Sequence, residues 1–221
     1  MRCGAGIFCG AQRAPKRTLA VSALKRLLSA IYSMVDLGEA KQYLGIHIKR
    51  DHDARTIYLD QTRYITKILE RFGMQDCRGI STMMEAATLQ PCPTDPAKTI
   101  KRTGYQSKVG NVMYAILGTR PDLTFAVSAL SKYNSCPITS DHSAMGRVLQ
   151  YLQATKITDI LYKGESKTTA MPEPVCYNDS GWAGDRDKRR STGGFVVVLC
   201  RGVVSWKTRK QDIVALSTTE P

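Results

Sequence analysis

The sequence has few of the residues that build disulfide frameworks or histidine-based active sites. Its seven cysteines form no Cys-x-x-Cys pair, and an odd number does not suit a closed set of disulfide bonds. None of its three histidines stands in an evident Ser-His-Asp or Cys-His arrangement. We therefore expect an intracellular protein, cytoplasmic or nuclear, in a reducing compartment, and not an independent small-molecule enzyme.

Acidic residues and long apolar runs are also scarce. No apolar run reaches the roughly 18 residues that suggest a membrane-spanning helix. Only 19 acidic residues stand against 32 basic ones, which leaves a net charge of +13. Such an excess attracts a polyanion. We expect RNA, DNA or an RNA–DNA hybrid as the partner, in preference to an anionic membrane surface, and leave the oligomeric state open.

The N-terminal segment has no acidic residue at all. Residues 1–34 contain six basic residues. A basic start that lacks acids can resemble a transit peptide, so mitochondrial import stays a minor alternative. Residues 1–21 have no assigned domain, and because their first part shows neither helical nor strand periodicity we expect them to be disordered.

Apolar periodicity divides the rest of the chain into elements and predicts an α+β fold. Apolar positions alternate on both sides of a polar turn, which predicts a β-hairpin over residues 44–59. A helical pattern follows from Tyr64 to Phe72, and prolines indicate an irregular linker over residues 77–104. Further helical patterns fill residues 105–163, and strand-like runs occur in residues 174–221.

Two clusters of polar residues are candidates for chemistry. His47 and His52 flank a turn with two aspartates, but their spacing matches no zinc pattern, so solvated side chains are the better interpretation. Asp179 lies near Asp185 and Asp187, and clustered carboxylates can hold divalent cations for phosphodiester hydrolysis. The alternative is a charged turn between strands.

Basic residues concentrate near the C-terminus. Residues 186–210 contain eight basic residues and one acid, and they include a tryptophan followed by cations. An aromatic beside cations can stack a base and contact phosphates, although the tryptophan can equally anchor a core. The predicted nucleic-acid-binding residues are Lys188, Arg189, Arg190, Trp206, Lys207, Arg209 and Lys210.

Six strings resemble the C-terminal part of copia-type reverse transcriptases, occur in the order of that family and together cover about residues 22–221. They are DLGEAKQYLGI at 36–46, ERFGMQDC at 70–77, YQSKVGNVMY at 105–114, TRPDLTFAVS at 119–128, DSGWAGD at 179–185 and VSWKTRKQDIVALSTTE at 204–220.

The resemblance implies a domain order for the chain. Residues 22–76 correspond to the end of the polymerase palm and the start of the thumb, and the hairpin is the palm edge that steadies the primer strand. Residues 105–163 correspond to a helical thumb and connection. Residues 174–221 correspond to an incomplete ribonuclease H-like sheet, in which Val196, Val198 and Trp206 would need a covering layer.

The resemblance also implies that catalysis is lost. The intact family binds Mg²⁺ through polymerase aspartates that include an Asp-Asp pair, and this sequence has no such pair. Asp179 matches the first ribonuclease H carboxylate and would form a weak, incomplete metal site. Gly181 stands where a second aspartate is usual, and Pro221 ends the chain one residue before a catalytic glutamate. We expect no bound cofactor, no catalysis and residual nucleic-acid binding.

Three origins fit these observations. The first is a decayed or wrongly delimited reading frame of a retrotransposon. The second is an incomplete gene model of an intact element, which an in-frame Tyr-x-Asp-Asp upstream of residue 22 would reveal. The third is a basic nucleic-acid-binding or interaction module, without enzymatic activity, that a host has recruited. Only the charge supports that third origin.

Overall fold

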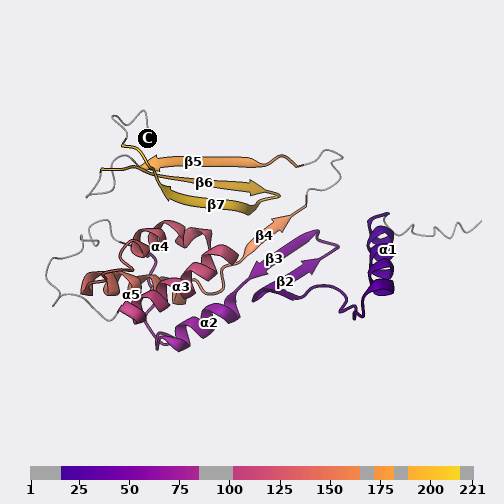
Figure 1. Ribbon diagram of the computed structural model, residues 1–221, viewed down its shortest axis with the longest axis horizontal. Coiled ribbons are helices and arrows are strands. Elements are labelled where there is room, and N and C mark those ends of the chain that lie inside the picture. Colours follow the sequence, from indigo (N-terminus) through magenta and orange to yellow (C-terminus); the bar gives the residue numbers. More distant parts are fainter. Residues whose placement is uncertain (1–15, 85–101, 165–171, 182–188, 215–221) are drawn as a thin grey trace, which may run out of the picture. The chain divides into compact units, whose positions relative to one another are not determined.

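The computed structural model describes residues 16–84, 102–164, 172–181 and 189–214 (Figure 1). It contains both helices and antiparallel sheets, so the expected α+β class is confirmed. Within those ranges, no helix is long and apolar enough to cross a bilayer. The chain divides into two compact units, residues 1–40 and 41–221.

The first unit contains the helix α1 (Lys16–Ile31). The expectation of disorder over residues 1–21 is corrected for residues 16–21, which belong to this helix. The reason is visible in the sequence, since Leu24, Leu27 and Ile31 follow helical spacing and a proline precedes the helix. These three side chains are exposed in the structure. Residues 1–15 lie outside the described ranges.

The segment after α1 is held by Asp36. Its carboxylate accepts hydrogen bonds from the Lys25 ammonium at 2.8 Å and from the Gly38 backbone N–H at 2.9 Å. Both contacts favour the charged carboxylate, Lys25 more strongly, and they lower the pKa of Asp36. This aspartate begins the DLGE string, whose glycine adopts a φ of 76°.

The second unit begins with an antiparallel sheet in the order β1 (Gln42–Tyr43), β2 (Ile46–Asp51), β3 (Thr56–Asp60) and β4 (Ile160–Lys163). The predicted hairpin is confirmed as β2 and β3. Its turn is stabilised by the Asp51 carboxylate, which accepts the Ala54 backbone N–H at 2.8 Å. Strand β4 was missed, because residues 105–163 were expected to be helical.

Four helices form the main core of this unit. They are α2 (Thr62–Arg71), α3 (Arg102–Gly118), α4 (Thr124–Ser131) and α5 (Thr139–Ala154). The helical pattern from Tyr64 to Phe72 is confirmed as α2, and the further patterns in residues 105–163 are confirmed as α3, α4 and α5. Helix α3 begins inside the expected linker, whose residues 85–101 are not described. The largest fully buried hydrophobic side chains are Ile65, Ile68, Leu69, Tyr105, Val112, Leu123, Leu130, Met145, Leu149 and Leu152.

A second antiparallel sheet follows, in the order β5 (Val175–Gly181), β6 (Thr192–Leu199) and β7 (Gly202–Lys210). The strand-like runs predicted in residues 174–221 are thereby confirmed. Figure 1 shows this sheet beside α4, and β7 packs against both α4 and β4. The sheet face that seemed uncovered in sequence therefore faces a helix of the same unit.

The described cysteines differ in redox state. Cys136, which follows α4, is disulfide-bonded. Cys77, Cys176 and Cys200 are free thiols. The sequence expectation concerned a closed disulfide framework, and it stays a prediction.

Candidate nucleic-acid interface

The candidate residues lie on the three-stranded sheet, whose register decides which of them are neighbours. Valines at consecutive positions of β6 favour a strand that packs on both faces. In the register, Asp179 lies opposite Gly194, which in turn lies opposite Thr208 of β7. In the adjacent row, Val196 of β6 lies between Tyr177 of β5 and Trp206 of β7 and is opposite both.

Side chains on β7 alternate between the two faces of the sheet. Trp206 and Lys210 are half-buried, whereas Lys207 and Arg209 are exposed. Because successive residues of a strand point to opposite faces, the predicted cluster is divided between two surfaces. Arg209 also forms an exposed ion pair with Asp212 at 2.8 Å. Lys207 and Arg209 therefore lie on one face of β7 and Trp206 on the other, although Lys207 and Trp206 both line the cavity described below.

The other predicted basic residues precede β6. Arg189 is exposed and adopts a φ of 51°, and Arg190 is half-buried. Lys188, Asp185 and Asp187 lie outside the described residues.

Asp179 lies on β5, a strand at the edge of the sheet, and its side chain is exposed. Gly181 is two residues further along, on the same face of the strand, and has no side chain to join it. Across the described ranges, no group of three His, Cys, Asp or Glu residues could hold a metal ion. Asp179 is the only carboxylate on β5.

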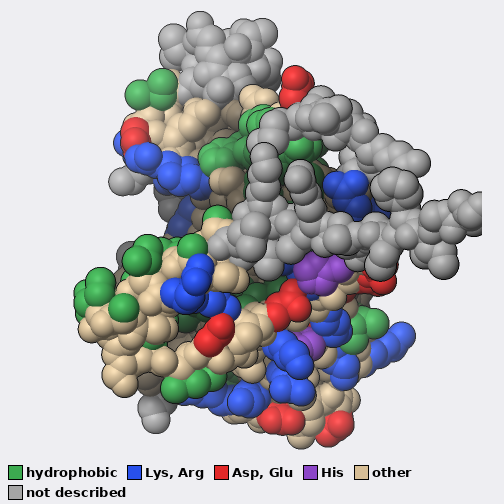
Figure 2. Space-filling model, turned by 90° about the vertical axis from the view of Figure 1, so that its right-hand side faces the viewer, with side chains coloured by type: hydrophobic (Ala, Val, Ile, Leu, Met, Phe, Trp, Pro, Cys, Tyr) green, Lys and Arg blue, Asp and Glu red, His purple; other side chains and the backbone are tan. Residues whose placement is uncertain are grey.

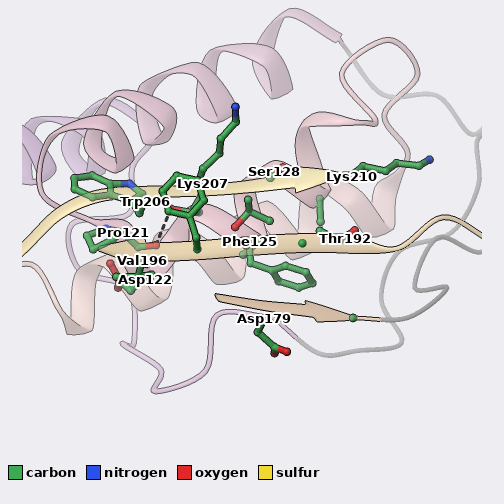
Figure 3. Close-up of a pocket in the computed structure, with 18 of the residues that line it drawn as sticks. Pro121, Asp122, Phe125, Ser128, Asp179, Thr192, Val196, Trp206, Lys207 and Lys210 are labelled. Carbon is green, nitrogen blue, oxygen red and sulfur yellow. Dashed lines mark hydrogen bonds between the residues drawn. The ribbon is translucent and has the colours of Figure 1, made fainter. Parts of the chain in front are cut away.

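A cavity of about 1060 Å³ lies between α4 and the sheet. Helix α4 contributes Phe125 and Ala129, followed by Lys132 at its C-terminal end, while the sheet contributes Tyr177 and Trp206. In Figure 3, Asp179 points away from Phe125. Sequence reasoning missed the helix residues, because no local pattern shows that α4 packs against a strand some eighty residues later.

Asp122, on the 3-10 helix η2 (Pro121–Leu123), also lines the cavity but is engaged by its neighbours. Its two carboxylate oxygens accept hydrogen bonds from the fully buried Arg120 guanidinium at 3.0 and 2.7 Å. The Tyr151 hydroxyl donates to the same carboxylate at 3.0 Å, and burial together with Asp122 raises the pKa of this tyrosine. The negative charge of Asp122 is thus balanced inside the fold.

Arg120 has further partners at the end of α5. It donates to the Thr155 carbonyl oxygen at 3.2 Å and to the Thr155 hydroxyl at 2.7 Å. Its guanidinium carbon also lies 5.6 Å from the centroid of the Tyr151 ring. This network joins the corner between α3 and α4 to α5.

The first sheet carries a separate polar group around Asp60. This carboxylate lies 3.3 Å from both His47 and Lys49, and it accepts the Thr62 backbone N–H at 3.2 Å. Burial alone would raise the pKa of Asp60, but the hydrogen bonds from Lys49, Thr62 and His47 outweigh it and lower that pKa. His47 is thus paired with a carboxylate of the sheet.

Figure 2 shows Lys and Arg side chains beside His side chains on one face of the molecule.

Comparison with known proteins identifies the family of this chain. Residues 15–86 match the model of the family described as "Reverse transcriptase (RNA-dependent DNA polymerase)". The chain is 34% identical over 207 residues to a retrovirus-related Pol polyprotein from transposon TNT 1-94 of Nicotiana tabacum. It is also 34% identical over 193 residues to an uncharacterized mitochondrial protein of Arabidopsis thaliana, and covers 77% of that protein. The chain belongs to the reverse transcriptase family of retrotransposon Pol polyproteins.

The resemblance to copia-type reverse transcriptases is therefore confirmed. The alignments cover 90% of this chain for the tobacco protein and 87% for the Arabidopsis protein, but the chain spans only 15% of the tobacco polyprotein. A protein named secreted RxLR effector protein 161, from Plasmopara viticola, is 44% identical over 121 residues, which are 55% of this chain and 82% of that protein. No solved structure matches the chain.

Proposed function

We propose that this chain is a nucleic-acid-binding part of a Pol polyprotein and that it does not itself polymerise DNA or hydrolyse RNA. Its partner is RNA, DNA or an RNA–DNA hybrid, as membership of the reverse transcriptase family suggests. The observation that carries the proposal is the contrast between exposed cations on β7 and a lone carboxylate on β5.

The proposed binding of nucleic acid depends on basic side chains that are exposed to solvent. Lys207 and Arg209 are exposed on one face of β7, and the whole chain carries a net charge of +13. Cations that neutralise phosphates release counterions, so the affinity falls as the salt concentration rises. Contacts of this kind position a backbone and carry no sequence information. We therefore expect the chain to bind different nucleic acids with little discrimination among them.

We expect no hydrolysis because Asp179 lacks, among the described residues, the further carboxylates that the reaction needs. Two-metal hydrolysis needs several carboxylates to hold the ions against their hydration shells. Asp179 could contribute to a Mg²⁺ site as the intact family builds it, but Gly181 offers no second ligand on the same strand. The sequence also has no Asp-Asp pair for polymerisation. Binding as proposed needs no cofactor.

The other elements serve as a scaffold in this proposal. The hairpin of β2 and β3 corresponds to the palm edge, and helices α2 to α5 correspond to the thumb and connection. The sheet of β5, β6 and β7 corresponds to part of a ribonuclease H-like domain.

The test is binding of the purified chain to an RNA–DNA hybrid at about 50 and 200 mM salt, with Mg²⁺-dependent cleavage followed in the same samples. We expect salt-sensitive binding without cleavage. Replacing both Lys207 and Arg209 by alanine should lower the slope of log affinity against log salt by roughly 1 to 2. Lys67→Ala, an exposed lysine on α2, is the matched control. Cleavage that disappears in Asp179→Asn would refute the proposal.

A further inference from the structure

The cavity between α4 and the sheet holds exposed aromatic side chains. Phe125 on α4 is 58% exposed and Tyr177 on β5 is 63% exposed, although both line the same cavity as the half-buried Trp206. Large apolar side chains that remain accessible inside a concavity indicate a binding surface more than a folding core. Figure 3 shows Phe125 among the residues of this cavity.

The charges around the cavity favour an anionic ligand. Lys132 is exposed at the end of α4, and Lys210 lies at the end of β7. Both line the cavity. Of the two carboxylates that also line it, Asp122 is paired with Arg120, which leaves Asp179 against the three lysines Lys132, Lys207 and Lys210. Aromatic faces with lysines at their margin are the features that bind unpaired nucleotides.

Stacking in this cavity favours unpaired bases over a duplex. The cavity volume of about 1060 Å³ is slightly above the usual range for small-ligand pockets, roughly 300–1,000 Å³. Bases within a duplex are already stacked on one another, so only unpaired bases can stack on Phe125 or Trp206.

We propose that this cleft binds single-stranded nucleic acid, with bases stacked on Phe125 and Trp206 and phosphates next to Lys132 and Lys210. This inference rests on the proposed function and concerns the cavity itself, whose lining includes Lys207 but not Arg209.

The test measures binding of the full chain to labelled oligo-dT and oligo-U of about 12 nucleotides, within the usual site size, and to an RNA–DNA hybrid duplex. Phe125→Leu keeps an apolar side chain but removes the aromatic face. It should weaken single-strand binding by about 5- to 150-fold, since stacking contributes roughly 1–3 kcal/mol per base. Binding to the duplex should be unchanged. The two oligonucleotides show whether the cleft prefers DNA or RNA.

Controls separate this inference from the proposed function. Tyr43→Leu removes an aromatic that is 65% exposed on β1, outside the cavity, and should leave both affinities unchanged. Quenching of tryptophan fluorescence by oligo-dT should fall in Trp206→Phe, and circular dichroism shows whether each variant is folded. If Phe125→Leu loses single-strand and duplex binding equally, or loses neither, the proposal that the cleft binds single strands is refuted, but the proposed function stays intact. Failure to bind any nucleic acid would overturn both.

Discussion

Replacing Arg120 by methionine tests whether the buried network holds the helical core together. Arg120 is fully buried, and its guanidinium makes two hydrogen bonds to Asp122 and two to Thr155. Methionine is unbranched and can fill much of the vacated space. It cannot donate, so the carboxylate of Asp122 and the carbonyl of Thr155 both lose their charged partner.

We expect Arg120→Met to lower the free energy of unfolding by about 3–5 kcal/mol, the usual cost of removing one partner of a buried ion pair. Natural domains have only about 5–15 kcal/mol in total. Urea unfolding at 25 °C, followed by circular dichroism, measures the loss. Arg63→Met, at an exposed position of α2, is the control and should change stability by less than about 0.5 kcal/mol.

The partner residue makes the test more specific. In a double-mutant cycle with Asp122→Asn, the second substitution should cost much less in the Arg120→Met background than in the native chain. A loss below about 1 kcal/mol for Arg120→Met, or strict additivity of the two substitutions, would refute the reasoning that this contact supports the corner between α3 and α4.

Two other substitutions test single contacts. Asp60 has a lowered pKa in the fold, so its stabilising contribution is present above its ordinary value of 3.8 and is lost as the pH falls through the folded value. Asp60→Asn should therefore destabilise the chain at pH 7 and reduce the difference in unfolding free energy between pH 7 and pH 3. Gly118→Ala should cost about 1–3 kcal/mol by overpacking, because its Cβ would clash with the side-chain amide of the buried Gln61. Thermal unfolding of Gly118→Ala against Gly104→Ala, whose Cβ would meet no atom within 4 Å, isolates that clash.

The elements that sequence could predict are those specified by neighbouring residues. Apolar alternation around a polar turn identified the hairpin of β2 and β3, and helical spacing from Tyr64 to Phe72 identified α2. Both patterns lie within about twenty residues. Strand β4 could not be found this way, because its four residues become a strand by pairing with Thr56–Leu59 of β3, a hundred residues earlier.

The candidate site was predictable only in part. The basic strand β7 was recognised from composition, and period-two alternation could already have separated Trp206 from Lys207. Phe125 carried no comparable signal, because its role depends on a sheet that follows it by dozens of residues. Arg120 was also unpredictable, since a fully buried arginine depends on partners from Thr155 and Tyr151.

The position of Asp122 has a consequence for interpreting mutants. The same carboxylate belongs to the wall of the cavity and to the contacts of Arg120. A substitution at residue 122 would change ligand affinity and fold stability at the same time, so lost binding in such a variant could not be assigned to recognition. Substitutions at Phe125 or Lys132 change the cleft alone. The side chain of residue 122, in contrast, contributes both to the stability of the fold and to the wall of the cavity.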